Sequence, residues 1–280
     1  LFTGWSELRV NPSKLLLPLL TLVISLIMMS PLIFSVLASF MNELEIYSGL
    51  LRIPTRISFE NYYDVLVKYK FAKLTINTTL ITSIVVVAAI PVAILATASL
   101  TLKRIRFKRT ILTVCVIGAT APEIMLMIPM FSLMSDLGLI NNFLSVILPY
   151  TAMTICFDML VLYSYQRGLP SEFIEAAYLD GASDWYLIWR ILTPLSKPAI
   201  MSAAILTTVF TWNSFILPLV LLPDPDMATL PVGLLRFSGQ YLVNVPLLLT
   251  GSIITSFPMI IFYLIFQGYV VKGVTFAVRE

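Results

Sequence analysis

The sequence predicts an all-α membrane protein that crosses the bilayer with six transmembrane helices and forms one domain over residues 1–280. Composition is the first reason, because 59% of the residues are hydrophobic and 12% are charged, against about a quarter charged in a soluble domain. The second reason is that the apolar residues lie in long runs separated by polar loops. Since a lipid-exposed backbone must satisfy its own hydrogen bonds, such runs fold as helices.

Six apolar runs are long enough to cross the hydrocarbon core, which takes about 20 helical residues. The first run exceeds the core of a secretion signal, so we expect it to be retained, with a few natural residues preceding Leu1. Prolines inside the spans are compatible with a helix bundle, because neighbouring helices satisfy the freed carbonyls. The predicted spans cover residues 15–40, 74–102, 111–134, 143–165, 198–222 and 246–271.

The distribution of Lys and Arg predicts that both termini lie in the cytoplasm. The short loop between the second and third spans is rich in cations, and such loops stay on the cytoplasmic side. With six spans, the termini and the polar loop 166–197 share that side. They hold 12 of the 18 cations: Arg9, Lys14, Lys103, Arg104, Arg106, Lys108, Arg109, Arg167, Arg190, Lys197, Lys272 and Arg279. The others lie in the longer external loops: Arg52, Arg56, Lys68, Lys70, Lys73 and Arg236.

The loop 166–197 predicts two short helices joined at a glycine. Glu172 and Glu175 favour the positive end of a first helix dipole. That helix is expected to end at Gly181, because glycine suits a left-handed C-cap. A second helix is expected over residues 184–192, before Pro194.

Two interpretations of this helix pair are open. Trp185 and Trp189 would suit an amphipathic helix that rests among lipid headgroups. The first helix is acidic, however, whereas a headgroup-bound helix is normally rich in Lys and Arg. The small residues Ala176 and Ala177 beside Glu175 suit a helix that inserts into a groove of another protein.

The spacing in this loop resembles the EAA loop of ABC-transporter permease subunits. The family pattern E-A-A-x3-G-x9-I-x-L-P is matched from residue 175 to 194, except that Thr193 replaces the leucine. The resemblance implies a coupling helix that docks in a cleft of a cytoplasmic ATPase and transmits its closure to the spans. The residues to which it assigns this coupling are Glu175, Ala176, Ala177, Asp180, Gly181, Ile191 and Pro194.

Further stretches resemble the six-span subunit of the maltose-type carbohydrate uptake family. They include I-S-F-E-N-Y-Y from Ile57, W-N-x-F-x-x-P from Trp212 and T-L-P-V-G-L-L from Thr229, whereas the tail after Thr275 departs from the family ending. The resemblance implies the type I ABC importer permease fold, a multi-pass position in a bacterial or archaeal plasma membrane, and transport of a sugar or oligosaccharide. It also implies three partners: a second permease of similar fold, a dimer of ATPase subunits and an extracytoplasmic solute-binding protein.

Several chemistries are disfavoured by what the sequence lacks. It holds no G-x-x-x-x-G-K-[ST] motif, so ATP and Mg are expected to be bound by the partner ATPase, with no cofactor in this chain. It holds no histidine, which removes the commonest general base and metal ligand. Cys115 and Cys156 lie in apolar runs and are expected to be small core residues. We therefore expect no enzyme activity, no metal site and no nucleic-acid partner.

Four polar or aromatic residues inside the spans are candidates for the substrate pathway. Glu123 and Asp158 are carboxylates at a depth where a charge costs about 3 kcal/mol, so each should face a cavity or a partner. Pro122 could unwind the backbone beside Glu123. Trp212 and Asn213 would suit a sugar by ring stacking and amide hydrogen bonds. The alternative for all four is interhelical packing and hydrogen bonding. For the two carboxylates, a position near the membrane boundary, where the group reaches water, is also open.

Two further hypotheses concern the outside of the membrane and the energy source. By the resemblance, Asp224 and Asp226 in the external loop would face the binding protein; the alternative is a solvated loop. A self-sufficient secondary transporter or channel, with Glu123 and Asp158 as relays, is the competing function. Co-purification with an ATPase discriminates between this function and the importer subunit.

Overall fold

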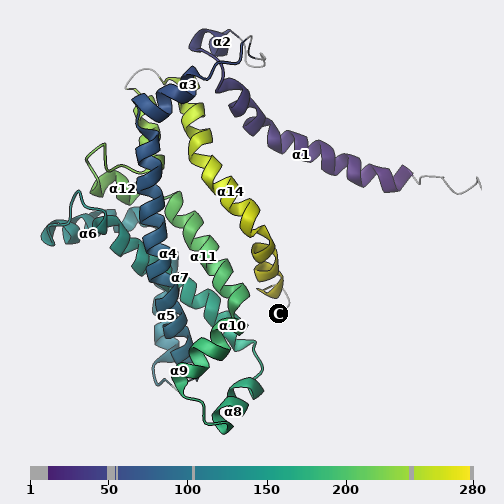
Figure 1. Cartoon of the computed structure of the whole chain (residues 1–280), viewed down its shortest axis with the longest axis vertical. Coiled ribbons are helices and arrows are strands. Elements are labelled where there is room, and N and C mark those ends of the chain that lie inside the picture. The colour runs from purple at the N-terminus through teal and green to yellow at the C-terminus, as the bar shows by residue number, and fades with distance from the viewer. Residues whose placement is uncertain (1–11, 49–53, 55, 103–104, 240–242, 278–280) are drawn as a thin grey trace, which may run out of the picture. The chain divides into compact units, whose positions relative to one another are not determined.

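The computed structural model describes residues 12–48, 54, 56–102, 105–239 and 243–277, which are almost entirely helical (Figure 1). Five charged positions used in the orientation prediction (Arg9, Arg52, Lys103, Arg104 and Arg279) lie outside the described residues. The α-helices are α1 (Pro12–Ala38), α2 (Glu43–Tyr47), α3 (Glu60–Tyr63), α4 (Phe71–Leu102), α5 (Lys108–Thr120), α6 (Glu123–Asp136), α7 (Leu144–Arg167), α8 (Glu172–Leu179), α9 (Asp184–Tyr186), α10 (Thr193–Leu195), α11 (Lys197–Trp212), α12 (Ile216–Leu221), α13 (Leu230–Gly233) and α14 (Val245–Ala277). Two π-helical turns (Asp64–Lys68 and Leu187–Leu192) and a 3-10 turn (Leu234–Phe237) complete the described helices.

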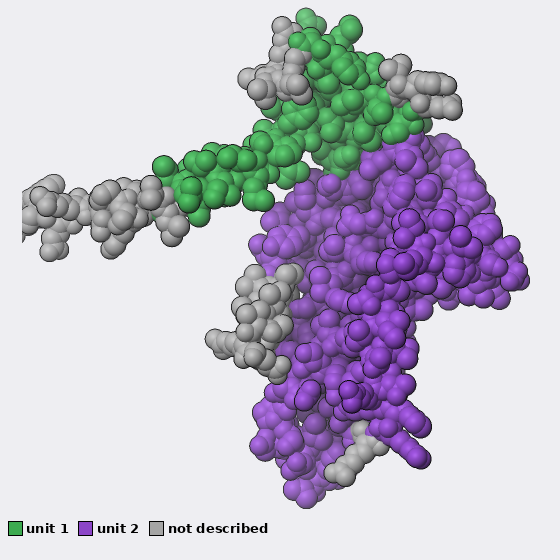
Figure 2. All heavy atoms as spheres, turned by 180° about the vertical axis from the view of Figure 1, so that it is seen from behind, with its two compact units in different colours: residues 1–68, 237–253 green, residues 69–236, 254–280 purple. Residues whose placement is uncertain are grey.

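The chain divides into two compact units, which Figure 2 shows in green and purple. The first comprises residues 1–68 and 237–253. Within it, the Asn61 amide donates to the carbonyls of Ser39 and Met41, each at 2.8 Å. The ring of Phe40 packs against Tyr62, whose hydroxyl lies 2.8 Å from Ser39 Oγ. These contacts fix the chain that follows α1 against the short helix α3.

The second unit comprises residues 69–236 and 254–280 and holds the helices that carry the candidate sites. Its largest helix pairing is α4 with α7, with α5 and α11 packed beside them. Small side chains make this close packing possible: Ala89, Ala93 and Ala98 of α4 are fully buried. Without a hydrophobic driving force between helices in lipid, small residues bring backbones near enough for dispersion contacts. These closely packed helices form the core of the second unit.

A buried polar chain ties α4 and α7 to the start of α11. Thr101 Oγ1 lies 3.1 Å from Gln166 Oε1, and Gln166 Nε2 donates to Ser196 Oγ at 3.2 Å. Both Gln166 and Ser196 are buried. These hydrogen bonds hold the two ends of the loop 166–197, at Gln166 and Ser196, close to each other and to α4.

Four described helices are long and apolar enough to cross a membrane: Pro18–Ala38, Phe71–Leu102, Leu144–Arg167 and Val245–Gly268. They correspond to the first, second, fourth and sixth predicted spans. The third predicted span, residues 111–134, corresponds to the pair α5 and α6, which is bent by 98°. The fifth is divided between α11 and the short α12. By length and composition, the described residues thus hold four candidate spans, or five if the bent pair is one span.

The bend between α5 and α6 has a local cause at Pro122. Helix α5 ends at Thr120, and Ala121 and Pro122 adopt extended conformations with ψ of 123° and 130°. Proline at position 122 disfavours the α conformation for the preceding residue. Helix α6 then starts at Glu123 and turns away from the line of α5 (Figure 1).

Candidate functional site

The loop 166–197 contains the predicted pair of helices. Helix α8 ends in a Schellman turn, in which Ala182 N donates to Ala177 O and Gly181 N donates to Tyr178 O, both at 3.0 Å. Gly181 has a φ of +79°, which confirms the predicted left-handed C-cap. The next helix begins at Ser183, whose Oγ accepts from Tyr186 N.

A hydrogen bond across this turn fixes the two helices relative to each other. The hydroxyl of Tyr178 donates to Asp184 Oδ1 at 2.9 Å. Burial and the nearby Asp184 carboxylate raise the pKa of Tyr178 above its usual value. The Tyr178 hydroxyl therefore stays protonated and available as a donor near neutral pH.

The seven residues assigned to coupling lie together on this loop. Four of them contribute to one hollow of about 560 Å³: Ala177, Asp180, Gly181 and Ile191. Glu175 and Ala176 are exposed on α8, and Pro194 is exposed on α10. Apolar side chains are also exposed at this end: Phe173 (53%), Leu179 (89%) and Trp185 (65%). The loop therefore exposes both apolar and acidic side chains, a composition suited to a protein contact.

Glu123 lies at the break between α5 and α6, where it joins three elements. Its Oε1 accepts from the hydroxyl of Tyr150 in α7 at 2.5 Å and from Leu217 N in α12 at 3.0 Å. It also lines a cavity of about 420 Å³. Sequence reasoning missed Tyr150, because a buried tyrosine in an apolar run has no local signal that names its partner.

Asp158 is fully buried behind this cavity rather than exposed in it. Thr207 of α11, which lines the cavity, donates to Asp158 Oδ1 at 2.8 Å. Asp158 Oδ2 has no hydrogen-bond partner among the described residues. The two predicted carboxylates therefore belong to one region of the second unit, one at the cavity and one behind its wall.

Trp212 and Asn213 do not join the carboxylates. Trp212 lines a different cavity, of about 410 Å³, formed by α4, α11 and α14. Its indole Nε1 donates to Thr255 O at 3.1 Å. Asn213 is exposed at the end of α11, and its amide donates to Val209 O at 2.8 Å. The four predicted pathway residues are thus divided between two sides of α11.

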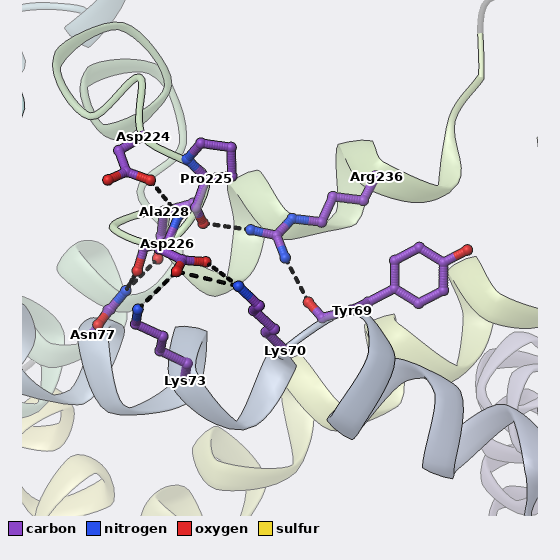
Figure 3. Close-up of polar contacts among 9 residues, drawn as sticks. All are labelled: Tyr69, Lys70, Lys73, Asn77, Asp224, Pro225, Asp226, Ala228 and Arg236. Atoms are coloured by element: carbon purple, nitrogen blue, oxygen red, sulfur yellow. Dashed lines mark hydrogen bonds and ion pairs between the residues drawn. The ribbon is translucent and has the colours of Figure 1, made fainter.

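The loop with Asp224 and Asp226 is fastened to the start of α4 by charged and amide groups (Figure 3). Lys70 Nζ lies 2.9 Å and Lys73 Nζ 3.1 Å from carboxylate oxygens of Asp226. The two ammonium groups lower the pKa of Asp226 below its usual value. Asp224 is exposed, and its Oδ1 accepts from Asp226 N at 2.8 Å.

Two other residues complete this attachment. Asn77 of α4 donates to the carbonyls of Asp226 and Ala228, each at 3.0 Å. The guanidinium of Arg236 donates to the carbonyls of Tyr69 and Pro225. Sequence reasoning missed Lys70, Lys73 and Arg236 as partners, because they were counted only as loop charges.

The long apolar helices, the broken helix pair and the polar loop define a class of protein, an integral membrane protein built from helices. Residues 89–276 match the family described as binding-protein-dependent transport system inner membrane component, and the chain belongs to that family. It is an ABC-transporter permease of the carbohydrate-uptake type predicted from its motifs, embedded in the inner membrane.

Two relatives and one solved structure illustrate the likeness. The chain is 30% identical to the diacetylchitobiose uptake system permease protein NgcG of Streptomyces coelicolor, over 90% of this chain and 84% of the relative. It is 30% identical to the trehalose/maltose transport system permease protein MalG of Thermococcus litoralis, over 94% and 95%. Its fold matches a bacterial ABC transporter involved in the import of the acidic polysaccharide alginate, with a TM-score of 0.79, 24% identity and coverage of 95% and 99%.

Proposed function

We propose that the chain is the transmembrane permease subunit of an ATP-driven importer for a sugar or oligosaccharide, and that it forms half of the translocation pathway. The relatives support the substrate class, since their names specify diacetylchitobiose and trehalose or maltose. A structure of similar fold contains a periplasmic protein bound to an alginate pentasaccharide, which supports an external binding protein as partner. A second permease and a cytoplasmic ATPase dimer, which binds the ATP and Mg, complete the proposed assembly.

The observation that carries the proposal is the rigid, exposed turn at Gly181. A lever that transmits force must keep its shape, and the Schellman turn, the Ser183 cap and the Tyr178–Asp184 hydrogen bond all restrain this segment. Its exposed Glu175 and Leu179 are available to a partner. We assign docking on the ATPase to this surface, with the loop and both termini in the cytoplasm and six membrane crossings, counting α5 with α6 and α11 with α12.

Co-purification tests this function directly. The chain is coexpressed with the permease, ATPase and binding-protein genes that neighbour its own gene, and it is extracted in mild detergent through an affinity tag. We expect the ATPase and a second permease to be recovered in stoichiometric amounts. Recovery of a stable chain with neither subunit would favour a self-sufficient transporter instead.

A further inference from the structure

The cavity at the α5–α6 break has features of a ligand site. It lies where a membrane helix is interrupted, and irregular backbone at membrane depth persists only inside protein or beside a polar cavity. Small side chains leave space for it, since Gly118, Ala119 and Ala121 all contribute to its lining. A Cβ on Gly118 would come within 3.1 Å of Cys156 Sγ, so the wall is closely packed there. Its volume of about 420 Å³ lies in the usual range of small-molecule sites.

The polar groups in this lining suit a carbohydrate. The described donors to Glu123 both use Oε1, which leaves Oε2 as a charged acceptor for ligand hydroxyls. Thr154 and Thr207 add hydroxyl oxygens, and the aromatic rings of Phe157 and Phe210 add apolar faces. A carboxylate, hydroxyls and rings together match the alternating hydroxyl and C–H surfaces of a sugar.

A lipid acyl chain fits this lining poorly. A carboxylate in contact with hydrocarbon is costly, and Glu123 is part of the wall. A sugar would instead satisfy the carboxylate by hydrogen bonds, which are stronger when the acceptor is charged.

The acidic groups at this cavity, and the lack of basic residues in the helix segments around it, favour uncharged sugars over uronates. The sequence holds no Lys or Arg from residue 110 to 166 or from 198 to 235, which covers most of α5, α7 and α11 and all of α6. Two acidic side chains, Glu123 in the lining and Asp158 behind it, belong to these segments. A uronate would meet the Glu123 carboxylate in a low-dielectric environment with no Lys or Arg of these segments to offset it.

We propose that this cavity is a subsite at which the chain itself contacts an uncharged glycosyl unit, and that it disfavours acidic oligosaccharides. The proposal deepens the transport function proposed above and rests on it. Glu123 Oε2 accepts hydroxyl protons of the sugar, and the rings of Phe157 and Phe210 pack on its C–H faces.

Photocrosslinking in the assembled importer tests the subsite. Phe157 is replaced by p-benzoylphenylalanine, with Phe131 as the control, since it is 43% exposed and absent from the cavity lining. Proteoliposomes receive labelled trehalose, maltotriose, arabinotriose, diacetylchitobiose or an alginate trisaccharide. We expect ATP-dependent uptake of at least one neutral sugar, with crosslinking of that sugar at position 157 and not at 131.

A second variant tests the role of the charge. Glu123→Gln keeps the acceptor for Leu217 N and Tyr150 but removes the anion. We expect the apparent KM for the neutral sugar to rise about tenfold, the scale of one hydrogen bond to a charged group. Assembly with the ATPase should stay unchanged.

The outcomes separate the subsite from the transport function. Uptake of a neutral sugar without crosslinking at 157, or crosslinking of lipid there, overturns the subsite and leaves the importer intact. Uptake and crosslinking of the alginate trisaccharide overturn the selectivity for uncharged sugars. An assembled complex with an active ATPase that takes up none of the five sugars contradicts the proposed function, and the subsite falls with it.

Discussion

The hydroxyl of Tyr178 donates to the carboxylate of Asp184 at 2.9 Å, across the turn at Gly181. Tyr178→Phe removes this bond, and because the pair is exposed we expect a loss of only about 0.5–1.5 kcal/mol in unfolding free energy. We expect the variant to stay folded but to import less sugar for each ATP hydrolysed, because the hydrogen bond no longer fixes the angle between α8 and α9. The ratio of sugar imported to ATP hydrolysed measures this effect.

Asp184→Asn is the matched control, because its side-chain oxygen still accepts from Tyr178. We expect this variant to keep a transport ratio close to that of the unmodified protein. Equal losses in Tyr178→Phe and Asp184→Asn would show that a neutral acceptor does not replace the carboxylate, and would contradict the expectation that the hydrogen bond alone is sufficient.

Gly181 has a φ of +79°, a conformation that costs other residues about 1–2 kcal/mol and that proline cannot adopt. We expect Gly181→Ala to retain partial uptake and Gly181→Pro to abolish coupling, with both proteins still inserted in the membrane. Uptake and ATP hydrolysis in proteoliposomes check this order. Normal coupling in Gly181→Pro would contradict the need for the left-handed turn.

Asp158→Asn keeps an acceptor for Thr207 and removes a buried acidic group. We expect the variant to assemble normally, because the amide has nearly the size of the carboxyl group and its oxygen can still accept from Thr207. Uptake should nevertheless change, since Thr207 lines the cavity. Size-exclusion chromatography and uptake kinetics measure the two effects separately, and loss of assembly would mean that Asp158 acts in helix packing.

The attachment of Asp226 to Lys70 and Lys73 should respond to acid. Lys70 and Lys73 lower the pKa of its carboxyl, so the folded state favours the charged form. The stabilisation is present above the unfolded pKa of about 3.9 and is lost as the pH falls through the lower folded pKa. We expect protease cleavage of the loop 223–229 to be constant from about pH 5 to 8 and to rise below about pH 4. Asp226→Asn should show the raised cleavage at neutral pH, and an unchanged rate in that variant would contradict the attachment.

Local signals in the sequence predicted some features well. Gly181 was expected to adopt a left-handed conformation and does so, because the need for φ above zero is a property of one residue. Pro122 was expected to loosen the backbone, and the chain bends there by 98°. The hydropathy of residues 111–134 marks one apolar span but does not give the angle of this bend, because hydropathy measures length and polarity.

Contacts between distant residues could not be predicted in the same way. Glu123 and Tyr150 are 27 positions apart, and Asp158 and Thr207 are 49 apart. In a span that is apolar on all sides, the pattern does not indicate which face meets which neighbour. For the same reason Trp212 was grouped with the carboxylates, although it lines the cavity on the other side of α11.

The proposed function assigns coupling to an ATPase to the loop 166–197. Sugar-stimulated ATP hydrolysis by the reconstituted complex measures this coupling, with Glu175→Lys on the exposed face of α8 as the variant. Glu43→Lys, an equal charge reversal on the exposed first turn of α2, is the control. We expect Glu175→Lys to lose at least nine tenths of the stimulation, the effect of about 1.4 kcal/mol, while the control keeps it. Full stimulation in a folded, assembled Glu175→Lys complex would contradict the claim.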